Sequence, residues 1–139
     1  SKKLKIDKKN IKKILRRKIL EDKSYIEKLE KIIHPLVRKE MRRFVIKNKH
    51  KKFLFFEIPL LIENKLMHHF DLIIFIKAKK NLRLKRFRLK GGSKKLFEFL
   101  NNKQLTDLKK IKHCDHVAVN EKNIKILRGS LLDIISQYE

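Results

Sequence analysis

The chain has 139 residues, 42% of them hydrophobic, and its 39 lysines and arginines against 15 acidic residues give a formal net charge of +24 at pH 7. This apolar content excludes an intrinsically disordered chain, and no apolar run is long enough to span a membrane. The single cysteine, Cys114, excludes an internal disulfide and suits a reducing compartment, so we predict a cytoplasmic protein without a membrane partner.

Three helices are expected before residue 50. In residues 7–21 apolar side chains recur four positions apart, which is a helical period, and Asp7 fits the N-cap position. Ser24 has the capping-box spacing to a glutamate three residues later and should open a second helix. The His-Pro dipeptide at 34–35 interrupts that pattern. Because proline suits the first turn of a helix, a third helix is expected over residues 35–48.

The centre of the chain predicts two strands. Residues 53–57, FLFFE, form an apolar run of the length of a buried strand, and residues 59–70 should follow as a turn and a short helix. The second strand, residues 71–78, is continuously apolar in its middle, as expected where both faces of a sheet are covered.

The remainder alternates helices with one more strand. A basic helix over residues 79–90, a Gly-Gly-Ser junction and a helix over residues 94–105 come first, followed by a short strand at 115–120 and a helix over 121–138. Strands that alternate with helices predict an α/β fold with a parallel sheet, in a single domain. The last helix is expected to bury Ile124, Leu127, Leu131, Ile134 and Ile135.

Two proline motifs are candidate binding sites. His34, before Pro35, would face a polar ligand at the helix junction, or it is a capping or core histidine. Pro59 cannot donate a ladder hydrogen bond, so the strand before it should end there, and ligands of open α/β sheets bind just beyond such strand ends. Glu57 and Glu63 would then accept hydrogen bonds or position Mg²⁺ through water, unless they are solvated side chains of a strand-ending turn.

The basic helix is a third candidate. Arg83, Arg86 and Lys90 lie three and four residues apart and share one helix face, and the two glycines that follow would serve as a hinge. Such a segment suits a lid over transferring phosphates, and the alternative is a solvated basic face. The possible metal ligands at 113–116 are adjacent and lack a second cluster such as C-x-x-C, so no metal site is predicted.

The net charge by itself favours a nucleic-acid or polyanionic partner. Lysine outnumbers arginine 30 to 9 and is spread along the whole chain, whereas arginine is preferred for forked contacts to phosphates and bases. A composition rich in Lys, Ile, Asn and Phe would produce the same charge. A basic nucleic-acid-binding protein is therefore the weaker alternative.

Several motifs in order along the chain resemble the dephospho-coenzyme A kinase family. They run from about Ile6 to the C-terminus and are LEKIIHPLV, FFEIPLLIEN, DLIIFIKA, RLKRFRLKGG, Gln104 and CDHVAVN. The family shows a His-Pro motif, a strand entering Pro-Leu-Leu-hydrophobic-Glu, an arginine-containing helix, a glutamine and an Ala-Asp-x-Val-Ile-x-Asn-like strand. Two departures are Lys90, where a second lid arginine is common, and Cys114, where alanine is usual.

The resemblance implies a P-loop kinase that transfers the γ-phosphate of ATP to the ribose 3′-hydroxyl of dephospho-coenzyme A, the last step of coenzyme A synthesis. By matching position it implies an acceptor side, a lid that meets the ATP phosphates, and a nucleotide side. The acceptor-side residues are His34, Pro35, Pro59, Leu60, Leu61 and Glu63; the lid residues are Arg86 and Lys90; the nucleotide-side residues are Arg83 and Asn120.

The phosphate-cradling sequence G-x-x-x-x-G-K-[ST] does not occur in these residues. The resemblance therefore implies a three-layer α/β/α P-loop kinase sheet that lacks its N-terminal P-loop strand and helix, with ATP and Mg²⁺ held through missing residues and the chain inactive alone. The expected parts are a helical acceptor-binding part at 1–50, core strands at 51–80, a lid at 81–105, and the last strand and C-terminal helix at 106–139. A related nucleoside or nucleotide kinase remains the first alternative.

Overall fold

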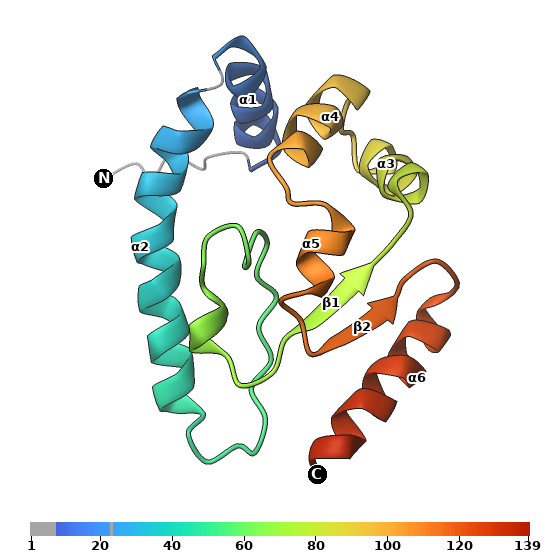
Figure 1. Cartoon of the computed structure of the whole chain (residues 1–139). Helices are drawn as coiled ribbons and strands as arrows, with labels where there is room; N and C mark the ends of the chain where they lie inside the picture. The colour runs from blue at the N-terminus through green and yellow to red at the C-terminus, as the bar shows by residue number, and fades with distance from the viewer. Residues whose placement is uncertain (1–7, 23) are drawn as a thin grey trace. The chain divides into compact units, whose positions relative to one another are not determined.

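The computed structural model describes residues 8–22 and 24–139, and Figure 1 shows the course of the chain. The chain divides into two compact units, residues 1–57 and 58–139, and each is described by itself. No helix of the described residues is both long enough and apolar enough to cross a membrane.

The first unit contains two helices, α1 (Lys8–Glu21) and α2 (Ser24–Lys47). The carboxylate of Asp22 accepts the backbone N–H and the hydroxyl of Ser24, both at 2.9 Å, so Asp22 satisfies a donor at the start of α2. These hydrogen bonds, the side-chain one first, lower the pKa of Asp22. The N-cap predicted at Asp7 lies outside the described residues.

Helix α2 runs through Pro35 without ending, so the predicted interruption at 34–35 was wrong. A proline inside a helix removes one i→i−4 hydrogen bond, and its ring fixes φ within the helical range. The helix-forming sequence on both sides continues the hydrogen-bond ladder past this single gap. The two helices predicted here are therefore one element of 24 residues.

Residues 53–57 do not form the predicted first strand. A strand requires a hydrogen-bonded neighbour, and the part of the chain that the structure describes provides none for this segment. Instead Phe56 packs edge-on against Phe44 of α2, with ring centroids 5.4 Å apart. Within this run Phe56 therefore packs against a helix of its own unit, whereas Phe55 is 64% exposed.

The second unit is built on a parallel pair of strands, β1 (Ile74–Lys77) and β2 (His116–Val119), paired from Ile74 with His116 to Lys77 with Val119. The predicted α/β fold with a parallel sheet is confirmed, and both strands lie inside the predicted ranges. The helices of this unit are α3 (Lys80–Leu89), α4 (Lys94–Asn102), α5 (Asp107–Ile111) and α6 (Ile124–Ile135), with 3₁₀ turns at Met67–His69 and Ser136–Tyr138. Helix α5, capped by the Thr106 side chain, was not predicted.

The core of the second unit lies between β2 and α6, which run side by side (Figure 1). Ala118 is fully buried against Leu127 and Ile134, which confirms the predicted inner face of the last helix at those positions. Ile124, also predicted to be buried, is 72% exposed because it opens α6 beyond the end of the strand. On the other face of the sheet, Val119 is 50% exposed, so the described residues cover the two faces unequally.

Candidate functional site

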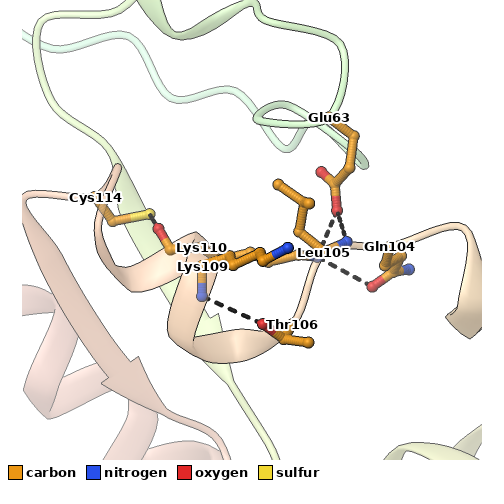
Figure 2. A network of polar contacts seen from close by, with 7 residues as sticks. All are labelled: Glu63, Gln104, Leu105, Thr106, Lys109, Lys110 and Cys114. Atoms are coloured by element: carbon orange, nitrogen blue, oxygen red, sulfur yellow. Dashed lines mark hydrogen bonds and ion pairs between the residues drawn. The ribbon is translucent and has the colours of Figure 1, made fainter.

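The turn after Pro59 holds its glutamate in a polar network with the segment before α5 (Figure 2). The Glu63 Oε1 atom accepts the backbone N–H of Leu105 at 2.9 Å and pairs with the Lys110 ammonium at 3.1 Å. The same ammonium donates to the Gln104 side-chain oxygen at 3.1 Å. The side chains of Glu63 and Lys110 are only 13% and 12% exposed.

The network keeps Glu63 ionised. Burial by itself would raise the pKa of this carboxyl, but the backbone N–H groups of Glu63 and Leu105 and the Lys110 ammonium together lower it below its ordinary value. Glu63 does accept hydrogen bonds, as its sequence position suggested, but the observed donors belong to the protein. Its contact with a bound acceptor stays a prediction.

The backbone around Glu63 is wound unusually tightly. Leu60 and Lys65 both have positive φ, 58° and 54°, a region that non-glycine residues enter at a cost of about 1 kcal/mol or more. The Asn64 and Leu66 N–H groups donate to the carbonyls of Leu60 and Leu61, which closes the turn. Pro59 at its start is exposed, whereas Leu60 and Leu61 are half-buried.

Arg86 and Asn120, predicted from separate motifs, come together at the carboxyl end of β2. The guanidinium of Arg86 donates to the Asn120 carbonyl at 2.9 Å. One residue on, Glu121 accepts the Lys79 backbone N–H at 3.2 Å and pairs with the Lys79 ammonium at 3.1 Å. Helix α3 is thus tied to the segment after β2, at the sheet edge where α/β folds bind ligands.

The glycines after α3 end that helix in a close turn. Gly91 has a φ of 76°, and the Gly92 N–H donates to the Phe87 carbonyl at 3.0 Å, the pattern of a Schellman cap. A Cβ on Gly92 would lie 2.0 Å from the Phe87 ring. Lys90, at the C-cap, is exposed. The close packing accounts for the glycines as a helix cap, and the hinge stays a prediction.

Comparison with known proteins assigns the family. The sequence model of dephospho-CoA kinase matches residues 6–125. The chain belongs to the dephospho-CoA kinase family. It is 29% identical over 120 residues to the dephospho-CoA kinase of Bartonella henselae and 30% identical over 120 residues to that of Bartonella quintana, covering 84% of this chain in both cases. The predicted family resemblance is confirmed.

The chain spans 62% of the length of both Bartonella dephospho-CoA kinases. The dephospho-CoA kinase of Protochlamydia amoebophila is 30% identical over 129 residues, which cover 89% of this chain and 64% of that protein. A crystal structure of a Thermus thermophilus protein, 22% identical, superposes with a TM-score of 0.72 over 92% of this chain and 67% of that one. This last likeness concerns the fold alone.

The remaining family-motif residues belong to the first unit. His34 is half-buried in the middle of α2, and Pro35 beside it is exposed. The same helix and residues 55–57 line an apolar groove of about 440 Å³, with Phe44 and Phe56 on its wall. His34 does not line this groove, and its contact with an acceptor stays a prediction.

The described residues do not by themselves fit a metal ion. No group of three or more His, Cys, Asp or Glu side chains among them lies close enough to hold one. Residues 113–116 were considered as possible metal ligands. Here the Cys114 thiol donates to the Lys110 carbonyl at 3.1 Å, and burial raises the pKa of the thiol. Asp115 accepts the Ile73 N–H at 2.7 Å, so it fixes the backbone just before β1.

Three of these structural residues were missed from the sequence. Lys110 is one lysine of a lysine-rich stretch, and nothing in its local pattern separates it from its neighbours. Asp115 and Glu121 flank β2 and bond to residues 42 positions earlier in the chain. Only the parallel pairing of β1 with β2 makes these contacts, although a carboxylate on each side of a short strand is a signal that could have been noted.

Proposed function

We propose that this chain forms the acceptor-binding and lid parts of a dephospho-CoA kinase. The reaction transfers the γ-phosphate of ATP to the ribose 3′-hydroxyl of dephospho-CoA and yields coenzyme A. The observation that carries the proposal is the meeting of Arg86 with Asn120 at the carboxyl end of β2, within a chain of this family. A guanidinium at that edge is available to neutralise charge that develops on a transferring phosphoryl group.

The lid residues act by charge. Arg86 exchanges the Asn120 carbonyl, a neutral acceptor, for a phosphate oxygen, and a charge-assisted bond is the stronger of the two. Lys90, one turn along the same side, supplies a second cation without the fork of an arginine. Asn120 and Arg83 complete the nucleotide side. The transfer then depends on positioning and on charge neutralisation rather than on a covalent intermediate.

Each unit contains one motif proposed to contact the acceptor. His34 and Pro35 of α2 form one, and the turn Pro59, Leu60, Leu61 and Glu63 forms the other. The Lys110 bond supports a fixed position for Glu63, so the turn offers a shaped, apolar rim to the acceptor. Mg²⁺ would bring charge to the phosphates when bound, but no cluster among the described residues suits it.

The complete fold in this proposal is a three-layer P-loop kinase. The loop that cradles the β- and γ-phosphates, the Mg²⁺ ligands and the acid that takes the 3′-hydroxyl proton come from residues outside these 139. A cytoplasmic location belongs to the same proposal and is supported by the single cysteine.

A chimera tests the proposal. The segment of the Bartonella henselae kinase that precedes its match to this chain is fused to residue 1, and ADP release is measured with ATP and each of three acceptors: dephospho-CoA, adenosine and AMP. We expect ADP release with dephospho-CoA alone, and none from the 139-residue chain without the added segment. Phosphorylation of adenosine or AMP but not dephospho-CoA would replace the proposal with a nucleoside or nucleotide kinase.

The nucleic-acid alternative has its own measurement. A gel shift at physiological salt with micromolar or tighter affinity, weakening steeply as salt rises, would support it. We expect no shift under these conditions.

A further inference from the structure

The second unit contains a polar pocket that the proposed lid and acceptor residues do not line, although Arg83 of the proposed nucleotide side does. Its volume is about 480 Å³, and it lies between the start of α3, the end of α4 and the segment leading into α5. Arg86, Asn120 and Glu63 do not line it. The residues that line it are Lys80, Arg83, Asn101, Asn102, Gln104, Leu105, Thr106 and Asp107.

Arg83 is the pocket residue with an unsatisfied buried hydrogen-bond donor. Its side chain is half-buried, and its Nε atom is buried without a hydrogen-bond partner among the described residues. It makes no ion pair with a carboxylate in that part of the chain, unlike Lys110 with Glu63 on the neighbouring segment. A buried Nε–H without an acceptor is costly, and an oxyanion bound in the pocket would offset that cost.

The other groups in the pocket include several hydrogen-bond donors. The Gln104 side-chain oxygen already accepts the Lys110 ammonium, so its NH₂ group is the part left for a ligand. The Thr106 hydroxyl oxygen accepts the Lys109 N–H at 3.4 Å, which leaves its hydrogen to donate. With Lys80 and the two asparagine amides, the pocket presents a donor set that suits a phosphate group.

Asp107 adds the one acceptor of opposite charge. Its side chain is half-buried at the pocket wall and would repel a bare anion. A ligand that carries hydroxyl groups beside its phosphate would instead donate to this carboxylate. We propose that the pocket binds a phosphorylated ribose, with the phosphate toward Arg83 and Lys80 and a ribose hydroxyl toward Asp107.

Both substrates of the proposed reaction contain a phosphorylated ribose, and only the choice between them rests on the proposed function. Binding is measured by isothermal titration of the 139-residue chain with ribose 5-phosphate and, separately, with inorganic phosphate. We expect Arg83→Gln to weaken ribose 5-phosphate binding about tenfold or more, because a charge-assisted bond is lost. Asp107→Asn should weaken ribose 5-phosphate binding and leave inorganic phosphate binding unchanged or stronger.

Arg88→Gln is the matched control, because Arg88 lies on the same helix, is exposed and does not line the pocket. Its affinity should stay within about twofold, since it removes the same charge without removing a pocket contact. Circular dichroism checks the fold of each variant, and Arg83→Lys, which keeps the charge but not the fork, should lie between wild type and Arg83→Gln. An equal loss in Arg88→Gln and Arg83→Gln, or no binding of ribose 5-phosphate at all, would overturn the pocket assignment.

The source of the phosphorylated ribose is decided by competition. Dephospho-CoA and ATP are each titrated against ribose 5-phosphate, and the one that displaces it in wild type but not in Arg83→Gln is the occupant. Arg83-dependent binding, together with a chimera that does not phosphorylate dephospho-CoA, would retain the pocket and reject the proposed function. Phosphorylation of dephospho-CoA by the chimera, with KM values for both substrates unchanged by Arg83→Gln in that chimera, would retain the proposed function and reject the pocket assignment.

Discussion

Replacing Lys110 with methionine tests how much the buried ion pair with Glu63 stabilises the second unit. The variant keeps the length and apolar stem of the side chain but removes the ammonium, which bonds both Glu63 and Gln104 at 3.1 Å. The Glu63 side chain, 13% exposed in the wild-type chain, would keep the Leu105 N–H as a donor. Since a hydrogen bond to a charged group contributes about 1.5 to 3 kcal/mol, we expect the free energy of unfolding to fall by about 2 to 3 kcal/mol.

The assay is urea unfolding followed by far-ultraviolet circular dichroism at pH 7, with Glu63→Gln and the double variant completing a cycle. Glu40→Gln is the matched control, because Glu40 pairs with Arg43 at 2.7 Å but both side chains are more than 60% exposed. Its effect should stay within about 0.5 kcal/mol. A loss in Lys110→Met no larger than that of the control, or a coupling energy near zero, would refute the claim that burial strengthens the pair.

Acid should reveal the same network. Because the folded-state pKa of Glu63 is lowered, its contribution is fully present above the unfolded value, about 4.5, and is lost as the pH falls through the folded pKa. The stability difference between wild type and Glu63→Gln should therefore shrink when unfolding is repeated below pH 4.5. A difference that stays constant into acid would show that Glu63 is not ionised by this network.

Further predictions concern substitutions at four positions. Gly92→Ala would place a Cβ 2.0 Å from the Phe87 ring and should lower the thermal midpoint by several degrees. Gly129→Ala, whose Cβ would have nothing within 4 Å, should raise the free energy of unfolding by about 0.5 to 1 kcal/mol. Equal shifts in the two variants would contradict the packing argument. Lys65→Gly should stabilise the chain by up to about 1 kcal/mol, because glycine adopts the positive φ of 54° without strain. Lys65→Ala should be near neutral in the same thermal melts. A loss of stability in Lys65→Gly would show that Lys65 is not strained. In the chimera, Arg86→Ala should lower kcat about 100-fold through lost charge neutralisation, and an unchanged kcat would remove Arg86 from the lid role.

The family and its chain order were readable from the sequence because they depend on local motifs. Each family motif is recognisable within a few residues: the His-Pro pair, the Pro-Leu-Leu-x-Glu turn, the basic helix and the strand CDHVAVN. Both strands of the parallel sheet were also predicted within a few positions. Apolar periodicity likewise identified most helices, since amphipathic spacing is a property of neighbouring residues.

Only the tertiary structure decided what those residues contact. The sequence could not say that α2 continues through Pro35, or that FLFFE packs beside a helix instead of pairing as a strand, because both outcomes depend on which partners the rest of the chain supplies. Glu63 meets Lys110 and Arg86 meets Asn120 across 47 and 34 positions of sequence, distances at which no local pattern carries information. The parallel pairing of β1 with β2 brings these distant segments together. Among the many charged residues of the chain, burial then makes Glu63 and Lys110 one structural ion pair.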